Sequence, residues 1–380
     1  SIDSGWSPQC ESYPANSSEW GVLKTTSVDW SGFNSSFNKK LPLELTPRKE
    51  IEVKPLDILV TRAGPTERVG VVSVVPHSVR SKLMISDKLI RLKSNEENNP
   101  LFLGISLSSV KCQNQLQSKT SGLAKSQANI AQKRLGEVLL KLPSKEEQTK
   151  IASFLSAVDE KISQLTKKHE LLSQYKQGMM QKLFSQQLRF KADDGSEFGE
   201  WEDKKLGEIS KTFSGGTPQS SNKSFYEGTI PFIKSGEISK NTTEQCINDL
   251  ALEKSSAKLV KKGDLLYALY GATSGQVAIS QIDGAINQAV LCIRSELNTK
   301  YLLNFLLLKK EEILTTYLQG GQGNLSASIL KEIYIPTPCL AEQTKIANFL
   351  SAIDQKIEVV AQQIEQAKTW KKGLLQQMFI

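Results

Sequence analysis

One stretch of this chain occurs twice. Residues 147–184 read EQTKIASFLSAVDEKISQLTKKHELLSQYKQGMMQKLF, and residues 342–379 read EQTKIANFLSAIDQKIEVVAQQIEQAKTWKKGLLQQMF. The two copies align without a gap at an offset of 195, and 18 of their 38 positions are identical. A self-match of this length indicates a duplicated structural unit. The chain of 380 residues is therefore predicted to hold two copies of one unit, each a globular domain followed by a helix.

The similarity continues upstream of both copies. VKPLDILVTRAG at 53–64 resembles VKKGDLLYALYG at 260–271, and IDSGWSP at 2–8 resembles TFSGGTP at 212–218. The segment 201–210 has no counterpart at the front of the sequence, so we expect a short equivalent piece to be missing there.

The repeat sets the predicted domain boundaries. The polar, glycine-containing stretch KADDGSEFGEW at 191–201 is interpreted as the junction into the second globular domain. The predicted order is a first globular domain, a first long helix, a second globular domain and a second long helix, at residues 1–143, 144–185, 186–338 and 339–380.

Both repeated stretches carry apolar residues at alternating steps of four and three. This spacing is the a/d pattern of a coiled coil. Ser144 and Glu147 form a predicted capping box at the start of the first helix, and neither stretch contains proline. The predicted seam consists of Ile151, Leu155, Val158, Ile162, Leu165, Leu172, Met179 and Leu183 in the first copy and Ile346, Leu350, Ile353, Ile357, Val360, Ile364, Leu374 and Met378 in the second.

The two helices are predicted to pack on each other as an antiparallel coiled coil. A helix of about 40 residues is ~60 Å long, and an apolar seam on each needs a partner. Two identical units related by a pseudo-twofold favour the antiparallel orientation. Lys176 and Lys371 occupy equivalent seam positions, where either the coil frays and the lysine stems extend to water, or the lysines fix register or partner. His169, also on the seam, is interpreted as a tolerated core-edge residue.

Each globular domain is predicted to be α+β, with a mixed or mostly antiparallel sheet and a few helices. Short β-like runs such as DILV at 57–60 and DLLYALY at 264–270 alternate with glycine and proline turns. LLNFLLLKKEEILTTYL at 302–318 is a predicted helix.

Several loops place basic or polar side chains beside glycine. Glycine lets a backbone approach a phosphate, while Arg, Lys, Asn and Gln can read base edges and Tyr can stack. For any one of these residues an ordinary solvated turn is the simpler interpretation; two copies facing one partner favour DNA contact for the set. The candidates are Lys24, Arg62, Arg68, Lys223, Lys234, Tyr267, Tyr270, Gln276, Gln322 and Asn324.

The composition offers little material for catalysis or metal binding. With 48 Lys and Arg against 40 Asp and Glu the net charge is +8, which fits a polyanionic partner without requiring one. The five cysteines form no C-x-x-C pair and there are two histidines, so no metal site is expected, and the thiols are typical of a reduced cytoplasmic protein. We find no Walker loop, no H-E-x-x-H, no G-x-S-x-G, no nuclease pattern and no Asn-Pro-Pro or Asp-Pro-Pro tetrapeptide.

The chain resembles the specificity subunits of type I restriction–modification enzymes. LPSKEEQTKIASFLSAVDEKI at 142–162 and IPTPCLAEQTKIANFLSAIDQKI at 335–357 look like the proline–EQ–helix signature of that family, present twice. Four segments resemble the target-recognition domain of that family: SGGTP, IPFIKSGEI at 230–238, KGDLLYALYG at 262–271 and GAINQAV at 284–290. WEDKKLGEI resembles the segment that opens this domain. The first globular domain matches less closely, and Cys339 stands where the first copy has its capping serine.

The resemblance implies a DNA-binding subunit with no catalytic activity of its own. In this family each target-recognition domain reads one half of a bipartite, asymmetric DNA site. The paired helices set the spacer between the halves and dock methyltransferase subunits, two per chain, and a restriction subunit can join the complex. S-adenosylmethionine, ATP and magnesium are expected only in those partners, and the location is expected to be cytoplasmic.

Two other classes of function stay open at this stage. An enzyme with unrecognised motifs would show activity as a purified chain. A structural protein, in which the coiled coil is the functional part, would bind no DNA sequence selectively.

Overall fold

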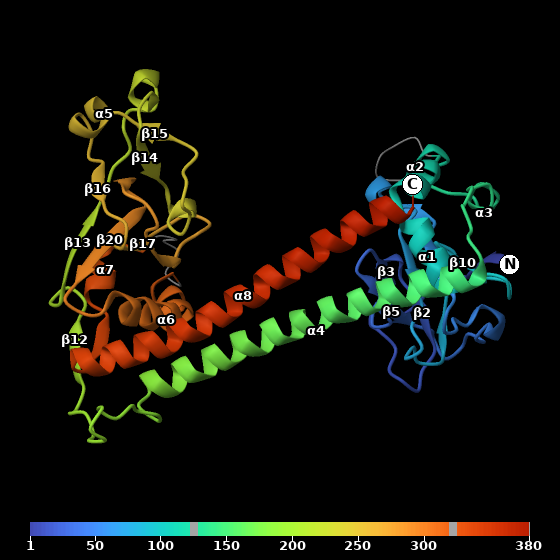
Figure 1. Cartoon of the computed structure of the whole chain (residues 1–380), viewed down its shortest axis with the longest axis horizontal. Helices are drawn as coiled ribbons and strands as arrows, with labels where there is room; N and C mark the ends of the chain where they lie inside the picture. Colours follow the sequence, from blue (N-terminus) through green and yellow to red (C-terminus); the bar gives the residue numbers. More distant parts are fainter. Residues whose placement is uncertain (122–127, 319–324, 380) are drawn as a thin grey trace. The chain divides into compact units, whose positions relative to one another are not determined.

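The computed structural model describes residues 1–121, 128–318 and 325–379. The chain forms two compact units (Figure 1). Unit 1 comprises Ser1–Leu165 and Gln363–Ile380, and unit 2 comprises Thr166–Gln362. The long helices α4 (Lys145–Phe184) and α8 (Leu340–Met378) each contribute one part to unit 1 and one part to unit 2.

Unit 1 contains two main sheets with helices packed beside them. The first sheet is antiparallel in the order β1-β10-β6-β8, and the second has the order β5-β2-β9 with β2 and β9 parallel. The strands are β1 (Ile2–Ser4), β2 (Gly21–Leu23), β3 (Val28–Asp29), β4 (Gly32–Phe33), β5 (Asn38–Lys40), β6 (Ile58–Thr61), β7 (Ala63–Gly64), β8 (Val72–Val74), β9 (Leu83–Met84), β10 (Leu89–Leu92) and β11 (Ala128–Asn129). The helices are α1 (Pro100–Ser108), α2 (Val110–Ser118) and α3 (Gln132–Leu135).

Strand β6 is the centre of unit 1. All four of its residues are buried, and its three aliphatic residues alternate between two apolar clusters. Leu59 joins one cluster, and Ile58 and Val60 join the other, because successive side chains of a strand point to opposite faces. Because apolar clusters cover both faces of the strand, Ile58, Leu59 and Val60 can follow one another, and burying one such aliphatic side chain contributes about 1.5–3 kcal/mol.

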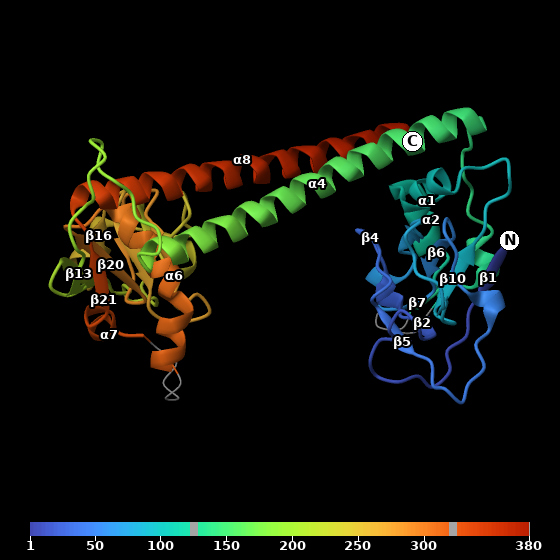
Figure 2. The same ribbon diagram turned by 90° about the horizontal axis from the view of Figure 1, so that it is seen from below.

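Unit 2 contains two sheets that correspond to those of unit 1, although its second sheet has four strands where that of unit 1 has three. One is antiparallel in the order β13-β20-β17-β18, and the other has the order β15-β14-β19-β16 with β14 and β19 parallel. Helix α6 covers one face of the first sheet (Figure 2), and β12 pairs with β21. The strands are β12 (Glu202–Lys205), β13 (Ser210–Ser214), β14 (Ile230–Ile233), β15 (Cys246–Ile247), β16 (Lys258–Val260), β17 (Leu265–Ala268), β18 (Val277–Ile279), β19 (Gly284–Ile286), β20 (Val290–Ser295) and β21 (Tyr334–Thr337). The helices are α5 (Asp249–Glu253), α6 (Thr299–Leu318) and α7 (Ala327–Lys331).

The two units match at the level of single residues. After β1 in unit 1 and after β13 in unit 2, the backbone runs so close to a neighbouring strand end that only glycine fits. A Cβ on Gly5 would lie 1.7 Å from the carbonyl oxygen of Ile85, and a Cβ on Gly215 would lie 1.7 Å from that of Ile286. The predicted α+β class and the internal duplication are therefore confirmed.

The start of each long helix is fixed by a repeated glutamine. Gln148 accepts a hydrogen bond at Oε1 from the backbone N–H of Asn99 at 2.9 Å and donates through Nε2 to the carbonyl of Pro143 at 3.0 Å. Gln343 makes the same two bonds, with Asn298 at 2.8 Å and with Pro338 at 2.8 Å. Both glutamines are buried, so these bonds satisfy polar atoms that would otherwise cost free energy. They give a physical reason for the repeated proline–EQ pattern.

The predicted seam positions of the long helices are buried or half-buried, with one exception. Met378, in the last turn of α8, leaves 37% of its surface exposed. In unit 2 the seam joins the main core, where Leu183, Ile346, Leu350 and Ile353 share one cluster. Helices α4 and α8 lie side by side within this unit (Figure 1), which fits the predicted coiled coil.

The two seam lysines form matching ion pairs across the helices. In unit 2, Lys176 Nζ lies 2.7 Å from Asp354 Oδ1, and in unit 1, Lys371 Nζ lies 2.5 Å from Asp159 Oδ1. The lysines and the aspartates are each related by the 195-residue repeat. Both Lys–Asp pairs can form only when the two helices are antiparallel and aligned in a single register. The structure therefore favours the interpretation that these lysines fix the register.

The junction after α4 is more ordered than its polar sequence indicates. Arg189 donates two hydrogen bonds to the wholly buried Glu342 carboxylate, at 3.1 and 2.9 Å, and Trp201 Nε1 donates a third at 2.9 Å. This clamp ties the junction to the first turn of α8. Glu147, the counterpart of Glu342 in α4, is exposed.

Candidate DNA-recognition site

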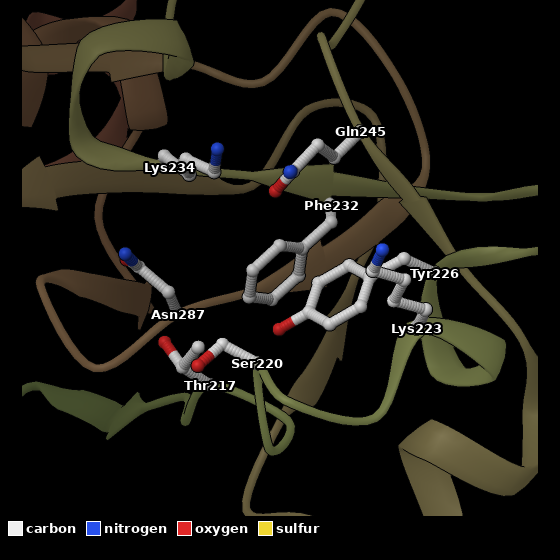
Figure 3. A pocket seen from close by; sticks show the side chains of 8 residues that line it. All are labelled: Thr217, Ser220, Lys223, Tyr226, Phe232, Lys234, Gln245 and Asn287. Carbon is white, nitrogen blue, oxygen red and sulfur yellow. The ribbon is translucent and has the colours of Figure 1, made fainter.

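Unit 2 carries a pocket at the edge of its second sheet, with a volume of about 430 Å³. Figure 3 shows the side chains around it. We call it the unit 2 pocket; its lining residues are Thr217, Ser220, Lys223, Tyr226, Phe232, Lys234, Gln245 and Asn287.

The parallel pairing of β14 and β19 creates one side of the pocket. Because parallel strands end at the same sheet edge, Lys234 after β14 and Asn287 after β19 become neighbours. The backbone N–H of Asn287 donates to the carbonyl of Ile233 at 3.3 Å. Gln245 reaches the same edge from the residue before β15.

Two aromatic rings form the floor of the unit 2 pocket. Phe232 is 1% exposed, and its ring meets that of Tyr226 edge-on with centroids 6.4 Å apart. Tyr226 is held in place because its hydroxyl donates to the carbonyl of Pro218 at 2.7 Å. In Figure 3 the rings and the Gln245 amide face the middle of the pocket, and Lys223 lies at the end away from Lys234 and Asn287.

The electrostatic character of the pocket is positive. Neither Lys223 nor Lys234 forms an ion pair within the part of the chain that the structure describes. The nearby Glu237 is buried and its carboxylate is used by backbone: it accepts the N–H of Lys234 at 3.2 Å and of Glu244 at 2.8 Å. Two free ammonium groups beside amide side chains suit contact with phosphates and base edges.

Unit 1 places Lys24 at the position equivalent to Lys234. Each lysine follows the strand that pairs in parallel, β2 or β14, and precedes a 3₁₀ turn. A second feature is also shared. Ser7 Oγ donates to Asp87 in unit 1, and Thr217 Oγ1 donates to Gln288 in unit 2. The sequence prediction of Lys24 and Lys234 as equivalent candidates therefore corresponds to equivalent places in the fold.

One predicted DNA contact is wrong. Tyr267 in β17 is fully buried, packed in the core of unit 2 against residues of α6 such as Phe305, so it cannot stack on a base in this structure. Burial raises the pKa of its hydroxyl to about 12. That hydroxyl has no hydrogen-bond partner among the described residues. The sequence prediction counted Tyr267 among the loop residues beside glycine, but β17 is a central strand covered on both faces.

Arg68 has a structural partner in unit 1. It pairs with Asp29 at 2.5 Å and donates to the carbonyl of Val28 at 2.7 Å, which attaches the β6–β8 connection to β3. The Arg68 guanidinium holds the pKa of Asp29 below its usual range. Arg62, at the end of β6, is half-buried. DNA contact by either arginine stays a prediction.

The other predicted contacts fall in different places. Of the predicted contacts that the structure describes, only Lys223 and Lys234 line the unit 2 pocket. Tyr270 is half-buried and Gln276 is exposed, both in the connection between β17 and β18. Gln322 and Asn324 lie outside the described residues.

The sequence prediction missed Gln245 and Asn287 of the unit 2 pocket. The motif GAINQAV includes Asn287, but no local feature of the sequence predicts that β14 and β19 pair in parallel although about 50 residues separate them. That pairing is what brings Asn287 beside Lys234.

The described residues contain no helix that could cross a membrane and no cluster of side chains that could hold a metal ion. None of their helices combines the length and apolar character needed to cross a membrane. No group of three or more His, Cys, Asp or Glu side chains in the same residues is close enough together to hold a metal ion.

Comparison with known sequences identifies the family. The family described as "Type I restriction modification DNA specificity domain" matches residues 29–173 and again residues 199–369. The EcoEI specificity subunit of Escherichia coli is 42% identical over 156 residues, which is 40% of this chain and 26% of that protein. The MjaVIII specificity subunit of Methanocaldococcus jannaschii is 28% identical over 348 residues, covering 86% of this chain and 79% of that one.

Solved structures agree on the fold. The S subunit of a type I restriction–modification system from M. genitalium superposes with a TM-score of 0.61 at 17% identity, covering 100% of this chain and 93% of that one. A chain from a study of the assembly and conformational transition of the type I system gives a TM-score of 0.59 at 18% identity, covering 100% and 98%. With two matches to the family, a duplicated α+β unit and a lysine-bearing site at the same place in both copies, the chain belongs to the type I restriction–modification specificity subunits.

Proposed function

We propose that each unit of this chain reads one half of a bipartite, asymmetric DNA site. The observation that carries the proposal is the pair of equivalent sites. Lys24 and Lys234 follow equivalent strands, so both units offer a cation at the same place to a common partner. A phosphate backbone is such a partner, because lysine contacts position a protein on DNA whatever its sequence.

The long helices serve as spacer and docking surface in this proposal. Helices of 40 and 39 residues pass from one unit into the other, so their length bears on the distance between the half-sites. The repeated Lys–Asp pairs support a fixed register between them. A pseudo-twofold pair of helices also offers two equivalent surfaces, which suits two methyltransferase subunits for each chain.

The chemistry is assigned to the partners. S-adenosylmethionine and adenine methylation belong to the methyltransferase subunits, and ATP and magnesium to a restriction subunit that joins through the complex. The chain itself acts as a reader without catalytic activity, in the cytoplasm where its DNA target lies. The missing catalytic motifs of its sequence support this division.

The proposal is tested by DNA selection. The chain, purified with its methyltransferase, is used to select duplexes from a random pool at one fixed salt concentration, since phosphate contacts make affinity depend on salt. We expect a gapped motif with two unlike halves and a constant spacer. An intact complex that enriches no motif would contradict the proposal and favour a structural role.

A further inference from the structure

The two units share the frame around the pocket. In the parallel strand pairs, Phe232 lies opposite Ala285 in unit 2, and Val22 lies opposite Met84 in unit 1. Phe232 therefore corresponds to Val22, and Ala285 corresponds to Met84. The hydroxyl of Ser7 in unit 1 and that of Thr217 in unit 2 donate equivalent hydrogen bonds. A lysine also follows the parallel strand in both units. The backbone scaffold at this edge is therefore the same in both units.

The side chains on this frame differ. The same register places Ser86 where unit 2 has Asn287, and Lys39 where unit 2 has Gln245. The ungapped alignment from Pro8 and Pro218 places Tyr13 where unit 2 has Lys223. A constant frame with changed polar groups is the pattern expected where each unit contacts a different sequence.

The amide of Gln245 is available for base recognition. Gln245 is exposed, and its side chain has no hydrogen-bond partner within the described residues, so both its oxygen and its NH₂ are free. Such an amide can bond to N6 and N7 of adenine together. Asn287 is more restricted. Its Oδ1 accepts the N–H of Ala289 at 3.1 Å, which leaves its NH₂ as a donor.

Resting on the proposed function, we propose that the unit 2 pocket is where this unit determines its half-site. Gln245 reads an adenine edge, and Asn287 donates to an acceptor on a neighbouring base. Lys223 and Lys234 hold the phosphates on either side. None of these roles requires a change in the fold, because the four side chains already line one pocket.

The test compares selected motifs from single variants of the chain in complex with its methyltransferase. Gln245→Ala should reduce discrimination at one position of one half-site by about 5- to 150-fold and leave the other half-site unchanged. Gln245→Glu should move the preference at that position from adenine toward cytosine, because a carboxylate accepts from cytosine N4. Gln281→Ala is the matched control, an exposed glutamine of unit 2 that lies outside the pocket.

The lysines give a separate readout. Lys234→Ala should weaken binding to all sequences about equally and lower the slope of log affinity against log salt by about 1. A wild-type complex without a gapped motif would overturn the proposed function itself. A gapped motif that Gln245→Ala and Gln245→Glu both leave unchanged would overturn only the assignment of the pocket.

Discussion

Lengthening both long helices by one heptad tests the spacer role directly. The ion pairs Asp159–Lys371 and Lys176–Asp354 are separated by 17 residues on each helix. Seven residues inserted between Asp159 and Lys176, with seven more between Asp354 and Lys371, keep both pairs and the a/d seam in register. Insertion in one helix alone would break that register.

The expected size of the effect follows from helix geometry. Seven residues at ~1.5 Å each extend the helices by ~10 Å, which corresponds to about 3 base pairs of DNA. We therefore expect the selected motif to keep both half-sites and to gain about 3 base pairs of spacer. Because 3 base pairs also turn the second half-site around the DNA axis by roughly 100°, affinity should fall relative to the wild type.

The assay is DNA selection by the wild-type complex and the double-insertion complex in parallel. A four-residue insertion in α4 alone is the control for register, and it should lower the melting temperature. An unchanged spacer with a folded double-insertion variant would refute the spacer role. Altered half-sites would show that the insertion acts on the reading units instead.

Three further predictions concern stability. Glu342→Ala should cost about 3 kcal/mol of unfolding free energy because it removes a wholly buried carboxylate and leaves the half-buried Arg189 without its partner, whereas Glu147→Ala, the exposed counterpart, should cost less than about 0.5 kcal/mol. Equal costs of the two substitutions in chemical denaturation would contradict the clamp. Tyr267→Phe should raise the free energy of unfolding by about 1 kcal/mol and leave DNA affinity unchanged, because it removes a buried hydroxyl that has no partner among the described residues. A loss of DNA affinity with unchanged stability would restore Tyr267 as a DNA contact. A double-mutant cycle of Lys176→Ala and Asp354→Ala should give a coupling energy of about 0.5 kcal/mol that decreases with added salt, and a coupling of zero at low salt would argue against the register device.

The long helices could be predicted from sequence because their signal is local. An a/d spacing repeats every seven residues, and the two copies report the same pattern independently. The pairing of the helices followed from the need to cover each apolar seam. The ion pair of Lys176 could not be assigned in the same way, because Asp354 is distant in the sequence and only antiparallel register brings the two together.

The site was less accessible to prediction because it depends on sheet pairing. Lys223 and Lys234 were recognised as cations in glycine-rich loops, a signal that many ordinary turns also carry. Asn287 and Gln245 become neighbours of Lys234 only through the parallel pairing of β14 with β19 and the antiparallel pairing of β14 with β15. Tyr267 was misplaced for a related reason, since its burial depends on which elements cover each face of β17.

The comparison of the two units separates what the fold requires from what recognition can vary. Gly5 and Gly215 are the same residue because a Cβ would collide with a carbonyl oxygen, and Gln148 and Gln343 are the same because each satisfies buried backbone groups. The positions of Gln245 and Lys223 carry no such constraint, since both side chains are exposed. In the proposed function, substitution there changes the groups offered to DNA at little cost in stability, which lets one duplicated scaffold present two different half-site readers.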